Sequence, residues 1–153
     1  MIGFYKLFIS LIILIYETNG KWPPSNLFIT AIMGEVKCKY ENEKKIVVTL
    51  YTMDRRKKKE IVLSSRYAEY GRPFLISGTY RSFTRPDFYL KIYHSCHKYS
   101  RIPYIERFDM KIDKYYVNRF QTKPHFLTLD DIELSKLKGQ KISYGFYKKQ
   151  TKF

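Results

Sequence analysis

Residues 87–99 read DFYLKIYHSCHKY, and this stretch has the clearest two-residue alternation in the chain. Successive side chains of a β-strand point to opposite faces, so the alternation predicts a strand with one buried face. The inward set is Phe88, Leu90, Ile92, His94 and Cys96, and the outward set is Asp87, Tyr89, Lys91, Tyr93 and Ser95. Cys96 stands between His94 and His97. Three roles fit such a cysteine: a metal ligand, a nucleophile beside its base, or half of a disulfide.

Similar patterns recur before and after this stretch. They predict further short strands within residues 34–40, 44–53, 60–65, 71–78, 107–113 and 124–134. We expect Ile46, Val48 and Leu50 to face inward in the second of these, and Cys38 to face inward in the first. Short helices are expected at most over residues 65–70 or 113–118. Many short strands joined by turns predict an all-β antiparallel sandwich or barrel.

The first twenty residues, MIGFYKLFISLIILIYETNG, resemble a secretory signal peptide. One lysine precedes an apolar block of about ten residues, whereas a membrane-spanning helix needs about twenty. We predict cleavage after Gly20, with an uncleaved anchor as the alternative. The predicted organisation is a signal over residues 1–20, a β-sandwich domain over 21–134 and a basic C-terminal tail over 135–153. The localisation predicted is secreted and extracellular.

The chain is strongly basic, with 29 Lys and Arg against 14 Asp and Glu, and a formal net charge of +15. In an exported protein this charge favours anionic glycans, acidic lipid head groups or acidic proteins as partners, and argues against nucleic acid. We expect no transmembrane segment in the mature chain. The two cysteines, Cys38 and Cys96, are most simply one disulfide in an oxidising compartment.

Several segments together resemble the nematode transthyretin-like proteins. Residues 86–96, PDFYLKIYHSC, are similar to the family's aromatic-Leu-x-Ile-x-His-x-Cys segment, and the segments 34–38, 47–51, 74–78 and 107–117 resemble further family strands in the same order. The likeness covers roughly residues 29–134 and implies a transthyretin-like, immunoglobulin-like antiparallel β-sandwich. A second cysteine pair common in the family is missing here, which leaves Cys38 and Cys96 as partners.

Two departures from the family bear on function. An acidic stretch usually follows the second strand, but here it is replaced by the basic run Arg55, Arg56, Lys57, Lys58 and Lys59. Asp113 stands where a proline is usual.

The related hydroxyisourate hydrolase needs a histidine and arginine set and a C-terminal Tyr-Arg-Gly-Ser, whereas this chain ends YGFYKKQTKF. We therefore predict no enzymatic activity, no catalytic residue, no metal and no cofactor.

The basic run lies at a predicted hairpin tip, and the tail adds further cations, among them Lys148 and Lys149. A solvated turn and a solubilising tail, or dibasic processing at the tip, are the simpler interpretations. The functional interpretation is an anion-binding surface. The sequence thus predicts a non-enzymatic extracellular binding or signalling module. The alternative is a protein–protein adaptor that uses a sheet face or edge, with charge serving solubility only.

Overall fold

The computed structural model describes residues 25–40, 45–54, 58–98, 104–123, 125–137 and 139–143. Several predictions concern residues outside these ranges: the signal peptide, the tip residues Arg55, Arg56 and Lys57, and the tail residues Lys148 and Lys149. Within the described ranges, the chain forms β-strands and two short 3₁₀ helices.

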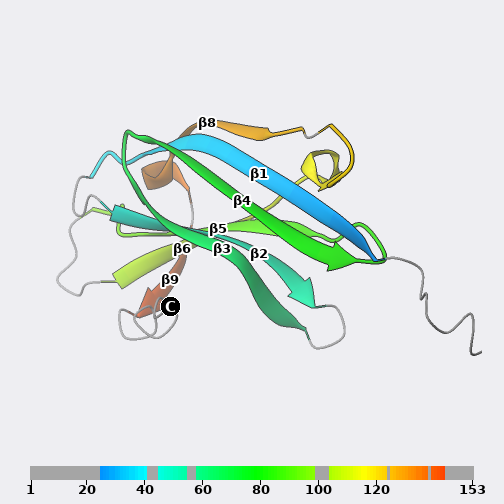
Figure 1. Ribbon diagram of the computed structural model, residues 1–153. Helices are drawn as coiled ribbons and strands as arrows, with labels where there is room; N and C mark the ends of the chain where they lie inside the picture. Colours follow the sequence, from blue (N-terminus) through cyan, green and yellow to red (C-terminus); the bar gives the residue numbers. More distant parts are fainter. Residues whose placement is uncertain are drawn as a thin grey trace, which may run out of the picture.

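The strands form two sheets that pack face to face (Figure 1). The first sheet has the order β4-β1-β7, and β8 also pairs with β1; these strands are Pro73–Ser82, Asn26–Lys37, Asn118–Arg119 and Leu127–Glu133. The second has the order β3-β2-β5-β6-β9, from Lys59–Glu69, Lys45–Asp54, Phe88–His94, Tyr104–Lys111 and Gln140–Ser143. Every pairing is antiparallel except β1 with β8. The predicted all-β sandwich is confirmed.

The core lies between the two sheets and consists of the side chains that alternation assigns to it. β2 contributes Ile46, Val48 and Leu50, each at most 1% exposed. β5 contributes its even-numbered residues, and β1 and β4 face them from the other sheet with Phe28, Ile32, Val36, Phe74 and Ile76. Burial of these large apolar side chains supplies most of the driving force for folding.

Two local predictions are wrong. Residues 65–70 were expected to allow a short helix, but β3 runs through them to Glu69 and pairs with β2 along its length. β1 begins at Asn26, well before the strand predicted at residue 34. The second helix candidate gives one 3₁₀ turn, Lys114–Tyr116 (η1), in which the backbone N–H of Tyr115 donates to the side chain of the N-cap residue Asp113.

Gly34 allows β1 and β8 to pair closely. A Cβ placed on Gly34 would lie 2.9 Å from both Cβ and the carbonyl oxygen of Leu129 on β8. The register of the two strands also shifts between Gly34 and Val36. The parallel pairing therefore depends on the absence of a side chain at this position.

The five-stranded sheet continues beyond residue 134, the predicted end of the domain. After β8 the chain makes a second 3₁₀ helix, Leu134–Lys136 (η2), and buries Leu134 in the core. β9 then pairs with β6 through Ile142 opposite Ile105. The first part of the predicted tail is thus an edge strand of the sandwich.

Candidate functional site

The cysteine of the HSCH segment forms a disulfide with Cys38, as predicted. Cys38 follows β1 and Cys96 follows β5, so the bond links the two sheets at one end of the sandwich, called here the disulfide end. The Cα atoms are 5.6 Å apart. Cys96 is 2% exposed and belongs to the core. With both sulfurs in this bond, neither cysteine is available as a nucleophile or as a thiolate ligand.

The two neighbouring histidines have structural contacts. Nδ1 of His94 accepts a hydrogen bond from the backbone N–H of Cys96 at 3.2 Å, and the ring is buried in the sandwich. Burial, with a smaller contribution from the nearby His97, lowers the pKa of His94 to about 4. His97 stacks on Tyr104 with ring centroids 3.9 Å apart. The described residues contain no group of His, Cys, Asp and Glu side chains suited to hold a metal ion.

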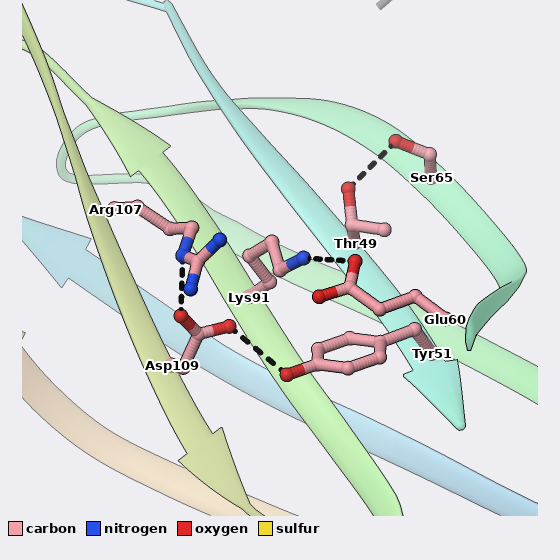
Figure 2. Close-up of polar contacts among 7 residues, drawn as sticks. All are labelled: Thr49, Tyr51, Glu60, Ser65, Lys91, Arg107 and Asp109. Atoms are coloured by element: carbon pink, nitrogen blue, oxygen red, sulfur yellow. Dashed lines mark hydrogen bonds and ion pairs between the residues drawn. The ribbon is translucent and has the colours of Figure 1, made fainter. Parts of the chain in front are cut away.

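The outer face of the five-stranded sheet carries a polar network that the sequence did not reveal (Figure 2). Lys91 lies at its centre, with Nζ 2.5 Å from Glu60 Oε2 and 4.3 Å from the ring centroid of Tyr51. Tyr51 donates to Asp109 at 3.1 Å, and Nε of Arg107 lies 2.6 Å from the other oxygen of the same carboxylate. Thr49 and Ser65 hydrogen-bond beside them, as Figure 2 shows.

Strand register brings these residues together. Lys91 on β5 stands opposite Thr49 on β2 and Asp109 on β6, and Thr49 stands opposite Ser65 on β3. Lys91 is on the outward face, as predicted, yet it is only 2% exposed. Burial, and next the Asp109 carboxylate, raise the pKa of Tyr51 above its ordinary value. A lysine enclosed in this way is not accessible from the solvent, and its contacts with Glu60 of β3 and Tyr51 of β2 link three neighbouring strands.

A small apolar cluster adjoins the network on the same face. Val47, Tyr93 and Ile105 are each at most 5% exposed, and Ile142 of β9 packs against them. Most outward residues of β2 and β5 are therefore buried as well as the inward ones: Val47, Thr49, Tyr51, Lys91 and Tyr93. The cluster explains why β9 joins the sheet: Ile142 of β9 stands opposite Ile105 of β6 and packs against the cluster, which removes apolar surface from water.

The opposite end of the sandwich, called here the hairpin end, gathers basic side chains. β2 and β3 form the predicted hairpin, with Asp54 and Lys59 as the last pair, and this hairpin diverges there from the end of β4 (Figure 1). Of the basic tip, Lys58 and Lys59 are described, and both are exposed. Five further exposed cations come from other segments of this end: Arg81, Arg85, Lys111, Lys114 and Arg119.

Contacts and cavities join these segments. Arg85 donates to the backbone carbonyl of Lys114 at 3.3 Å, and Lys111 lies 3.1 Å from Asp87. A cavity of about 660 Å³ is lined by residues that include Asp54 of β2 and Arg81 of β4. A second cavity of about 290 Å³ shares Arg81 and also includes Arg119. The sequence gives no motif for this arrangement, because its cations come from separate strands and loops.

The fold and its cross-link define a small β-sandwich module that suits an oxidising, extracellular setting. A sequence model of the transthyretin-like family (TTR-52) matches residues 33–113, which is more than half of the chain. The chain therefore belongs to the transthyretin-like family. No curated protein matches it significantly. In the described part of the chain, no helix has both the length and the apolar character to cross a membrane.

Proposed function

We propose that the chain is a secreted, non-enzymatic binding or signalling module, a divergent nematode member of its family, whose basic tip and tail contact anionic extracellular surfaces. The observation that carries this proposal is the position of the basic run. Its described residues, Lys58 and Lys59, are exposed where β3 begins, with Lys59 opposite Asp54 at the end of β2. Arg81, Arg85 and Lys114 are exposed at the same end of the sandwich. Family membership and the inter-sheet disulfide support the extracellular setting.

The clustering of positive charge at the hairpin end brings electrostatic repulsion, and the needs of folding do not explain it. Five adjacent cations, Arg55 to Lys59, repel one another, and further cations at the same end add to the repulsion. Exposed charges contribute little to stability in either direction. Their fields add, however, and a polyanion experiences the sum, weakened by salt over a screening length of about 8 Å at physiological ionic strength.

Retention on immobilised heparin and on acidic-lipid vesicles tests the proposal. In the tip variant, Ser replaces Arg55, Arg56, Lys57, Lys58 and Lys59. In the control variant, Ser replaces five exposed or half-buried cations at or near the disulfide end: Lys37, Lys39, Arg66, Arg72 and Lys98. Both variants lose the same charge. We expect the tip variant to elute at much lower salt than the control variant, with both melting temperatures nearly unchanged.

Equal elution of the two variants would show that net charge alone governs retention, and the tip would be a solvated turn. If the tip variant is retained like the wild type, the tail, with Lys148 and Lys149, becomes the segment to test next. The mass of the secreted protein checks the setting separately: the mature chain is expected to begin at Lys21, so a mass that includes residues 1–20 would contradict cleavage.

One observation favours the alternative of a protein–protein adaptor. Met33 on β1 and Leu75 on β4 stand opposite each other on the outer face of the four-stranded sheet, and they are 47% and 52% exposed. Adjacent exposed apolar side chains mark protein contact sites more often than isolated ones do. If Met33→Ser with Leu75→Ser abolishes capture of an extracellular partner that the tip variant still captures, the adaptor function is favoured.

A further inference from the structure

Two arginines at the hairpin end are left without a partner by the described part of the chain. The other four described arginines each bind a carboxylate or a backbone carbonyl: Arg66, Arg72, Arg85 and Arg107. For the side chains of Arg81 and Arg119, the described residues offer no hydrogen bond or ion pair, and both are exposed. Guanidinium groups are strong donors to carboxylate, sulfate and phosphate.

These two arginines flank the beginning of β1. Arg81 on β4 stands opposite Leu27, and Arg119 on β7 stands opposite Phe28 on the other side of the strand. Their backbones are thus two strand spacings apart, about 10 Å. Leu27 and Phe28 point to opposite faces of β1, so the register starts the two arginine side chains on opposite faces of the sheet, and they meet only at the cavity beside the beginning of β1. Both line the cavity of about 290 Å³, together with Ser25, Asn26, Leu27, Phe120 and Gln121.

The Arg119 side of the cavity is held in place by the backbone. The N–H of Phe120 donates to the carbonyl of Leu27 at 2.9 Å. The buried amide of Asn118 donates to the carbonyls of Tyr116 and His125, and Thr122 donates to the carbonyl of Arg119. A site fixed before its ligand arrives costs less ordering on binding.

We propose that this cavity binds one sulfated sugar unit of an extracellular glycan, with the sulfate between Arg81 and Arg119. This inference rests on the proposed function, since it names the anion that the hairpin end would bind. The side chain of Phe120 is 62% exposed at the cavity and offers an apolar surface to a sugar ring. Ser25, Asn26 and Gln121 supply hydrogen-bonding groups for hydroxyls. The volume is near the lower limit of about 300 Å³ for small-molecule sites, which suits one sugar unit.

The adjoining cavity favours a glycan over a lipid surface. It shares Ser25 and Arg81 with the first cavity, and it combines the aromatic residues Tyr80, Phe83 and Tyr89 with the carboxylates of Asp54 and Asp87. Carboxylates accept hydrogen bonds from hydroxyls, and Asp87 also pairs with Lys111. The neighbouring unit of a glycan chain would therefore contribute hydroxyls here, whereas phospholipid head groups with few hydroxyls would leave these acceptors unused.

The test compares two double variants in the full secreted protein. Arg81→Gln with Arg119→Gln removes both guanidinium groups, and Arg66→Gln with Arg72→Gln removes two exposed arginines near the other end. Calorimetry measures the affinity of a heparin-derived hexasaccharide and of its desulfated counterpart at about 0.15 M salt. We expect at least a tenfold loss of hexasaccharide affinity for the first variant and less than twofold for the second. The difference should disappear with the desulfated sugar.

Equal losses in the two double variants would overturn the site, because charge alone would then explain binding. A loss of binding to vesicles containing phosphatidylserine, with hexasaccharide affinity retained, would assign the cavity to a phospholipid and overturn the sugar proposal. The tip variant separates this inference from the proposed function. If the tip variant keeps its retention on heparin while the Arg81 and Arg119 variant loses the hexasaccharide, the role of the tip fails and the cavity stands. If the tip variant loses its retention on heparin while the Arg81 and Arg119 variant keeps its hexasaccharide affinity, the proposed sugar site fails and the role of the tip stands.

Discussion

The carboxylate of Glu60 lies 2.5 Å from the ammonium of Lys91 across the outer face of the five-stranded sheet, yet the two side chains differ greatly in exposure. The side chain of Lys91 is 3% exposed and that of Glu60 is 40% exposed. The lysine has thus lost its hydration on folding, while the glutamate keeps much of its own. Removing one partner or the other should therefore have unequal effects.

Replacing Glu60 with Leu should lower the free energy of unfolding by about 2–3 kcal/mol, because it leaves the buried ammonium of Lys91 without its carboxylate. Replacing Lys91 with Met should change it by less than about 1 kcal/mol, because the apolar stem is kept and the glutamate remains hydrated. Urea unfolding of the single variants and of the double variant measures both. A larger cost for Lys91→Met than for Glu60→Leu would contradict the argument.

The Cys38–Cys96 bond should contribute strongly to stability. It closes a loop with a sequence separation of 58 and joins strands of opposite sheets. Chain-entropy reasoning gives about 4 kcal/mol for a loop of this size. Replacement of both cysteines by Ser should lower the urea midpoint accordingly and raise the slope, because the unfolded chain without the cross-link is less compact. Alkylation of the native protein before reduction should label neither cysteine, and labelling of both would show that the bond is absent from the secreted protein.

His94 should make stability depend on pH. Its folded pKa of about 4 lies below the value of about 6.5 in an unfolded chain. The unfolded state therefore takes up the proton first as the pH falls, and stability decreases from about pH 6.5 down to about pH 4, by up to roughly 3 kcal/mol. Above pH 6.5 this contribution is constant.

The variant His94→Asn keeps an acceptor for the N–H of Cys96 but does not titrate in this range. It should be less stable than the wild type at pH 7, and the gap should narrow by about 2 kcal/mol or more as the pH approaches 4. Leu90→Ala, a core variant on the same strand, should show a gap that is independent of pH. A constant gap for His94→Asn as well would contradict the lowered pKa.

The sequence predicted the sandwich because alternation is a local property. The spacing of Ile46, Val48 and Leu50 identifies the buried face of β2 without information from any other strand. The burial of Lys91 was beyond such reasoning, because Glu60 reaches it from a different strand. Arg81 and Arg119 likewise share a cavity only because β1 lies between their strands. The helix expected at residues 65–70 failed because pairing with β2 outweighed local propensity.

Gly34→Ala should weaken the attachment of β8. The added methyl group would lie 2.9 Å from the Cβ and the carbonyl oxygen of Leu129, so the β8 backbone would have to move. Overpacking of this kind costs about 1–3 kcal/mol. Gly71→Ala is the matched control: its cost arises from a positive φ of 69° at a turn with open space around it, and it leaves β8 untouched. Hydrogen exchange should therefore accelerate over residues 127–133 in Gly34→Ala and stay unchanged there in Gly71→Ala. Equal protection of β8 in both variants would show that the strand adapts to the methyl group and that the glycine is not required for the pairing.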